Sequence, residues 1–178
     1  MINKQHFREK CIKRLQKVKY KRKYYKDKQI NRLLYELIKE ENSCSIMLYL
    51  PLKMEVNIYP LINALRKEKK KLYVPFMEGK SFRLVRYRLP LNKKQFGIKE
   101  PNISKQYRRK QLDLAIVPII GLDSTLRRVG FGKGMYDRFF EKECGHIKQV
   151  VFVARDLCYS KEIVTSDYDV KADRVIVA

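Results

Sequence analysis

Residues 112–138 read LDLAIVPIIGLDSTLRRVGFGKGMYDR and join the most apolar run of the chain to three closely spaced glycines. The run Leu112–Ile120 is almost continuously apolar, which is typical of a central strand covered on both faces. The glycines and Lys133 then precede a helical segment, Tyr136–Cys144, that Gly145 ends. Glycines let backbone amides approach an anion closely, and the lysine adds a charge for phosphate oxygens. The stretch predicts a phosphate-binding turn between strand and helix. A tight connection without a ligand is the alternative, since the Walker A spacing is absent.

Helical and strand-like segments alternate outward from this stretch. Apolar residues at helical spacing predict a basic amphipathic helix within residues 1–30 and helices at 29–41 and 56–68. Short apolar runs predict strands at 45–50, 71–76, 82–89, 149–154 and 174–177, and a polar loop covers 92–110. This alternation predicts an α/β layered sandwich with a mostly parallel central sheet flanked by helices, in a single domain over residues 1–178.

Positive charge dominates the composition. Lys and Arg total 41 against 19 Asp and Glu, which gives a net charge of +22. Such a field attracts polyanions, whether nucleic acid, a nucleoside triphosphate or an acidic small molecule, and its sign does not choose among them. Twelve basic and two acidic side chains fall in the first 30 residues. A solvated basic helix face is the favoured interpretation, and a dedicated RNA-binding arm is the alternative.

The cysteines give no sign of a metal site or of secretion. Cys11, Cys44, Cys144 and Cys158 form no CxxC pair and do not cluster with the two histidines, which argues against structural zinc. We expect four reduced thiols. No apolar run reaches the roughly 18 residues of a membrane span, so the sequence predicts a soluble, cytoplasmic protein without membrane association.

Residues 130–137, GFGKGMYD, with Val117-Pro118 upstream and Arg128 just before, resemble the signature of the 5-formyltetrahydrofolate cyclo-ligase family, also called 5,10-methenyltetrahydrofolate synthetases. Further pieces of the family pattern occur in order along the whole chain: Lys4 and Arg8, Tyr49-Leu50-Pro51, Glu55-Val56-Asn57, Val74-Pro75, Gly97-Ile98-Lys99-Glu100-Pro101, and Asp169 to Asp173. The chain departs from the pattern at four positions. These are Leu126 for the usual glycine, Val129 for leucine, Met135 for the first of two tyrosines, and Tyr168 for histidine.

The resemblance implies an ATP- and Mg²⁺-dependent enzyme that converts 5-formyltetrahydrofolate, with or without a polyglutamate tail, into 5,10-methenyltetrahydrofolate. Phosphorylation of the formyl oxygen makes it a leaving group, N10 closes the ring, and ADP and phosphate are released. Positioning and electrostatics do the catalytic work in such a reaction. We expect a monomer that binds nucleic acid only non-specifically, if at all.

The resemblance also implies site residues. Catalysis is assigned to Arg128, Lys133 and Tyr136. ATP binding is assigned to Lys4, Arg8, Arg128, Gly130, Gly132, Lys133, Gly134, Met135 and Tyr136. Folate binding is assigned to Leu50, Met54, Glu55, Phe131, Met135 and Tyr136. Asp137 and Asp169 supply hard oxygen ligands for Mg²⁺.

Chemistry supports several of these roles. Lys4 and Arg8 are four apart on one helical face, so both reach the same phosphates. The Glu55 carboxylate accepts hydrogen bonds from the amino and N–H edge of a pterin. Each has a plainer alternative, namely solvated lysine and arginine side chains and an acidic residue at the start of a helix.

Two other functions remain open. The first is an RNA- or ribosome-associated binding protein that uses the +22 charge. The second is a nucleotide-binding α/β protein without folate turnover, because Leu126 and Met135 depart from the family pattern.

Overall fold

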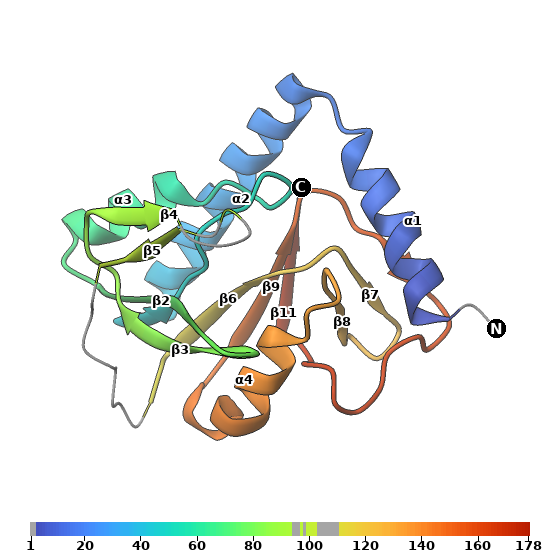
Figure 1. Ribbon diagram of the computed structural model, residues 1–178. Helices are drawn as coiled ribbons and strands as arrows, with labels where there is room; N and C mark the ends of the chain where they lie inside the picture. Colours follow the sequence, from blue (N-terminus) through green and yellow to red (C-terminus); the bar gives the residue numbers. More distant parts are fainter. Residues whose placement is uncertain (1–2, 94–96, 98, 103–110) are drawn as a thin grey trace.

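Figure 1 shows a computed structural model of the chain, which describes residues 3–93, 97, 99–102 and 111–178. The helices are α1 (Lys4–Gln16), α2 (Tyr20–Glu40), α3 (Tyr59–Lys67), α4 (Met135–Glu143) and the 3₁₀ turn η2 (Cys144–His146). The strands are β1 (Ser45–Met47), β2 (Lys71–Glu78), β3 (Ser81–Arg86), β4 (Leu91–Lys93), β5 (Lys99–Pro101), β6 (Leu114–Pro118), β7 (Gly121–Asp123), β8 (Arg128–Val129), β9 (Val150–Ala154), β10 (Tyr159–Ser160) and β11 (Arg174–Val177).

The main sheet has six strands in the order β11-β9-β6-β1-β2-β3. Neighbouring strands are parallel except β2 and β3, which form an antiparallel hairpin. All five residues of β6 are buried, as the apolar run of the sequence predicts. Two smaller sheets, β10-β7-β8 and β4-β5, flank it. The predicted α/β fold with a mostly parallel sheet is confirmed.

Alternate residues of the central strands face two different helical layers. Ile116 and Val153 pack with buried residues of α2 and α3. Val117 and Phe152 pack with two phenylalanines of α4, Phe139 and Phe140. A strand that is buried on both sides must be apolar at every position, which explains the continuous runs in β6 and β9. The sheet is therefore the middle layer of a sandwich (Figure 1).

Several boundaries differ from the predicted ones. The basic N-terminal segment is broken after Gln16, and α2 starts at Tyr20 rather than at 29. Helix α3 starts at Tyr59 rather than at 56, with Pro60 in its first turn, because the Asn57 side chain accepts a hydrogen bond from the Tyr59 amide at 3.1 Å and holds a turn there. Within the predicted loop, β4 and β5 pair. Residues 94–96, 98 and 103–110 of that loop lie outside the described residues.

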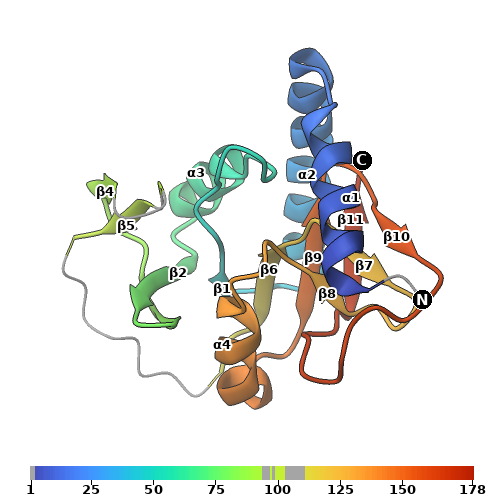
Figure 2. The same cartoon turned by 45° about the vertical axis from the view of Figure 1, so that its right-hand side comes forward.

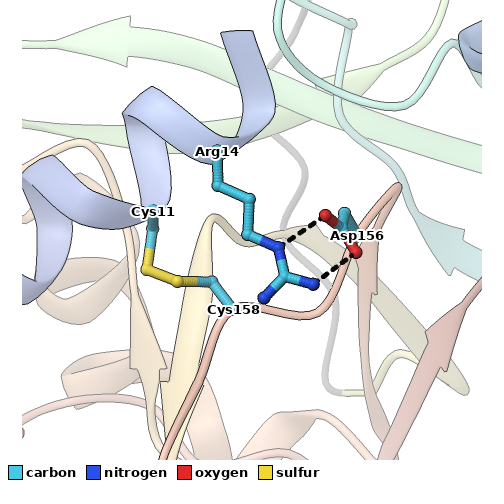
Figure 3. Close-up of a disulfide and its surroundings, with 4 residues drawn as sticks. All are labelled: Cys11, Arg14, Asp156 and Cys158. Carbon is cyan, nitrogen blue, oxygen red and sulfur yellow. Dashed lines mark hydrogen bonds and ion pairs between the residues drawn. A yellow bond between two sulfur atoms is a disulfide. The ribbon is translucent and has the colours of Figure 1, made fainter. Parts of the chain in front are cut away.

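The prediction of four reduced cysteines is wrong for two of them. Cys11 of α1 and Cys158 form a disulfide, with Cα atoms 5.5 Å apart (Figure 3). Beside it, Arg14 donates to Asp156 at 2.6 Å, so two links join α1 to the segment after β9. The two cysteines are 147 positions apart, so the sequence does not reveal that they lie close together. Cys44 and Cys144 are free. Over the part of the chain that is described, none of the helices has the length and apolarity that crossing a bilayer requires.

Candidate functional site

A cavity of about 380 Å³ opens where strands β1, β2 and β6 end. In parallel sheets ligands bind at the carboxyl ends of the strands, which is where this cavity lies. Its lining includes nearly every residue that the sequence proposed for the site. Those residues are Lys4, Arg8, Leu50, Glu55, Arg128, Gly130, Phe131, Gly132, Lys133, Gly134, Met135, Tyr136, Asp137 and Asp169.

Met54 is the member of the proposed folate set that does not line this cavity. Its carbonyl instead accepts a hydrogen bond from Arg155 at 2.9 Å. Arg155 directly follows β9 and forms a two-bond ion pair with Asp27 of α2, at 2.6 and 2.9 Å. Arg155 therefore anchors the loop that carries the neighbouring Glu55.

The glycine loop has backbone angles that side chains disfavour. Gly132 has φ +91° and Gly134, the N-cap of α4, has φ +63°. A Cβ on Gly132 would lie 3.3 Å from the guanidinium carbon of Arg8. The same arginine donates from Nε to the Gly130 carbonyl at 2.9 Å. The fold thus places a side chain of α1 directly on a loop that follows it by more than 120 residues.

Arg128 and Asp137 form a buried ion pair on the cavity wall. The guanidinium donates to both carboxylate oxygens, at 3.1 and 2.7 Å. It also lies 5.1 Å from the centre of the Tyr136 ring, over which it stacks as a cation. Both oxygens of one proposed Mg²⁺ ligand therefore already have a positive partner.

Asp169 is also paired with a cation of the site. It accepts hydrogen bonds from the Lys4 ammonium and from the amide of Ser166. Burial disfavours its charged form, but the bonds from Lys4 and Ser166 outweigh that effect and lower its pKa. The proposed ATP ligand Lys4 and the proposed metal ligand Asp169 thus contact each other.

The donor set fits Mg²⁺ only in part. Among the described residues no three His, Cys, Asp or Glu side chains gather as a metal cluster. Mg²⁺ in proteins commonly takes one or two carboxylates and completes its shell with phosphate oxygens and water. Asp137 and Asp169 line one cavity, so they fit an ion that a bound phosphate chain helps to hold.

Among the carboxyl groups of the cavity lining, Glu55 is the one whose pKa is raised. Burial raises its pKa to about 7, although the Leu52 amide, 2.8 Å from Oε2, favours the charged form. Glu55 therefore closes a turn at Leu52 and does not cap α3. Burial and the charge of Glu55 also raise the pKa of the Tyr136 hydroxyl, which stays a neutral hydrogen-bond donor.

Sequence reasoning did not place several lining residues: Tyr49, Leu52, Pro75, Met77, Phe82, Lys99, Pro118 and Tyr168. The family pattern already contained five of them, Tyr49, Pro75, Lys99, Pro118 and Tyr168, and the Val-Pro pairs at 74–75 and 117–118 carried a signal from their place in the sheet. Each pair lies in or at the end of a parallel strand, at the edge of the sheet where ligands bind.

The model of the 5-formyltetrahydrofolate cyclo-ligase family matches residues 1–178. The chain belongs to this family. A 5-formyltetrahydrofolate cyclo-ligase of Haemophilus influenzae is 32% identical over 109 residues, a match that covers 57% of this chain and 58% of the relative. The chain thus matches less than two thirds of that relative's length.

Solved structures of the family share the fold of this cyclo-ligase family member. The 5,10-methenyltetrahydrofolate synthetase of Aquifex aeolicus superposes with a TM-score of 0.82 at 28% identity, over 98% of this chain and 89% of the other. The synthetase of Mycoplasma pneumoniae superposes with a TM-score of 0.77 at 19% identity, over 98% of both chains, which is a likeness of fold.

Proposed function

We propose that this family member is a 5-formyltetrahydrofolate cyclo-ligase, which uses ATP and Mg²⁺ to form 5,10-methenyltetrahydrofolate with release of ADP and phosphate. One observation carries the proposal. The glycine loop, five basic side chains and a carboxyl group with raised pKa line the same cavity, beside apolar and aromatic walls. A phosphate chain and a flat, polar-edged ring system require these two kinds of surface.

ATP supplies the phosphoryl group that turns the formyl oxygen into a leaving group. The protein binds ATP and the folate, aligns their reacting groups and shields them from water. Lys4, Arg8 and Lys133 offer positive charge to the phosphates, and the amides beside Gly132 and Gly134 offer donors. Arg128 is held by Asp137 in a fixed orientation, which favours stabilisation of charge that spreads onto phosphoryl oxygens.

The folate would lie against the apolar side of the same cavity. Leu50, Phe131 and Met135 offer flat or flexible apolar contact to a pterin. When ionised, Glu55 accepts two hydrogen bonds from the pterin edge. The buried hydroxyl of Tyr136 remains a donor near Glu55 throughout the neutral pH range. Met135, which departs from the family's usual tyrosine, keeps apolar contact but offers no hydroxyl.

The decisive experiment measures methenyl absorbance with 5-formyltetrahydrofolate, in the presence and absence of ATP and of Mg²⁺. Product formation is expected only with all three. Lys133→Ala should lower kcat/KM at least ten-fold, since a charged contact to phosphate is worth about 1.5–3 kcal/mol. Lys142→Ala, at the exposed end of the helix α4 that follows the glycine loop, is the matched control and should turn over like the wild type.

Product formation without ATP would contradict the proposal, and so would full activity of Lys133→Ala. A thermal shift with ATP and none with 5-formyltetrahydrofolate would instead support a nucleotide-binding protein without folate turnover. The monomeric state, the single domain, the cytoplasmic location and the use of polyglutamylated folate stay predictions of the sequence.

A further inference from the structure

Three tyrosines stand exposed at the beginning of α2, at the end of the molecule where α1 and α2 meet (Figure 2). The exposed fractions of Tyr20, Tyr24 and Tyr25 are 86%, 62% and 68%. Tyr20 and Tyr24 are one helical turn apart, and the rings of Tyr24 and Tyr25 pack edge to face at 5.7 Å. Single exposed aromatics are ordinary, whereas a contiguous group of them marks an interaction surface.

The fold gives these tyrosines no structural task. The buried face of α2 begins at Ile30 and continues through Leu34 and Ile38, one to several turns further along the helix. The first turns of α2 therefore extend beyond the part of the helix that packs on the sheet, as Figure 2 shows.

The tyrosines stand in the densest basic stretch of the chain. Exposed basic side chains surround them: Lys17, Lys19, Lys21, Arg22 and Lys28. None of these five forms an ion pair with a residue of the described chain. No acidic residue lies between Glu9 and Asp27, and the Asp27 carboxylate is held by Arg155. We call these three tyrosines and five basic residues the tyrosine patch.

We propose that the tyrosine patch binds single-stranded nucleic acid, with phosphates on its basic residues and bases stacked on its tyrosines. Aromatic rings among lysines and arginines are the two elements that single strands require. A duplex hides its base faces, so it would use the charges alone. An anionic membrane is the less suitable partner, because residues 17–29 contain no Leu, Ile, Phe or Met to enter the lipid.

The patch is separate from the candidate active site. Lys4 and Arg8 lie near the beginning of α1, and Tyr20 follows the end of that helix. At 1.5 Å per residue, Arg8 and the end of α1 are about 12 Å apart along the axis, and Tyr20 lies beyond that end. Variants of the patch should therefore leave cyclo-ligase turnover unchanged, which separates this proposal from the proposed function.

The test uses fluorescein-labelled 12-nucleotide oligouridylate and oligothymidylate, a 12-base-pair RNA duplex, and vesicles with 30% phosphatidylserine. Affinity of the full chain is measured by fluorescence anisotropy and by vesicle co-sedimentation, at several salt concentrations. Tyr20→Ala/Tyr24→Ala should bind the single strands at least ten-fold more weakly with an unchanged salt slope. Tyr20→Phe/Tyr24→Phe keeps the rings and should bind like the wild type.

Two further double variants test whether nucleic acid binds to the basic residues of the tyrosine patch or to the overall positive charge of the protein. Lys21→Gln/Arg22→Gln should reduce the slope of log K against log salt by about 1.4, at about 0.7 per phosphate contact on a single strand. Lys67→Gln/Lys142→Gln removes the same charge from exposed positions on α3 and α4 and should leave the slope unchanged.

If Lys67→Gln/Lys142→Gln reduced the salt slope as much as Lys21→Gln/Arg22→Gln, the proposal would be overturned, because binding would then depend on the overall charge of +22. Unchanged affinity of Tyr20→Ala/Tyr24→Ala, equal affinity for the duplex, or binding to vesicles but not to oligonucleotides would each overturn it as well. Equal binding of the uridylate and thymidylate probes supports recognition of the phosphates and base faces that RNA and DNA share. A preference for one probe identifies which of the two nucleic acids the patch binds.

Discussion

Glu55 should make the stability of the protein fall as pH rises from acidic to neutral. Its pKa in the folded protein is about 7, against an ordinary value of 4.5. Between these two values the folded protein holds a proton that the unfolded chain has lost, so the free energy of unfolding decreases as pH rises through this window. The difference of about 2.5 between the two pKa values is worth about 3 kcal/mol, at 1.36 kcal/mol each. Above pH 7 this contribution is fully lost.

Glu55→Gln removes the titration and keeps the shape. Urea unfolding followed by circular dichroism at pH 4.5, 6 and 7.5, at constant ionic strength, should show the wild type losing about 3 kcal/mol more than Glu55→Gln over this range. Glu78→Gln, at an exposed position at the end of β2, is the control and should follow the wild type. If the stabilities of the wild type and Glu55→Gln change in parallel with pH, the Glu55 carboxyl group is solvated and burial does not raise its pKa.

The same carboxyl group should couple folate binding to proton release. A pterin edge that donates two hydrogen bonds selects the ionised form, and about half of the protein holds a protonated Glu55 at pH 7. Calorimetric titration of 5-formyltetrahydrofolate in two buffers of different ionisation enthalpy should report the release of about 0.5 proton per molecule bound at pH 7. Glu55→Gln should release none and bind more weakly. Equal proton release in both proteins would assign the proton to another group.

Three further predictions follow from buried or strained positions. Cys11→Ser should lower the free energy of unfolding by about 3–5 kcal/mol in urea without reductant, because the disulfide closes a very long loop, whereas Cys44→Ser should have no effect. Leu126→Gly should raise the free energy of unfolding by about 1 kcal/mol in the same assay, because Leu126 has φ +60°, an angle that strains leucine but not glycine. A decrease in the free energy of unfolding would show that the side-chain contacts of Leu126 outweigh this backbone strain. Arg128→Met should lower the free energy of unfolding by about 3–5 kcal/mol, because Asp137 would be left charged and buried without a cationic partner. The double variant with Asp137→Leu should recover much of that loss, and no recovery would show that the ion pair does not set the stability here.

The sequence predicted the strands best where burial on both faces leaves an unmistakable pattern. The apolar runs of β6, β9 and β11 are found within about two residues of their predicted ends. The small sheet of β7, β8 and β10 was not predicted, because strands of two or three residues carry no periodicity. The Cys11–Cys158 disulfide was missed for a related reason. Contact between residues 147 apart depends on tertiary packing, which composition does not encode.

In the candidate site, too, the sequence predicts what local chemistry determines and misses what tertiary packing determines. Residue types near the glycine loop follow from local chemistry, so its residues could be named before the fold was known. The pairing of Lys4 with Asp169 and of Arg128 with Asp137 could not, since each joins segments that only the fold brings together. These pairs mean that both carboxylates proposed for Mg²⁺ are neutralised before any ligand arrives. If the proposed Mg²⁺ and phosphate chain bind in this cavity, Lys4 would pass from Asp169 to phosphate oxygens and Asp169 would hold the metal, so neither charge would be left buried and alone. In the structure itself, the two ion pairs leave neither carboxylate buried without a partner of opposite charge.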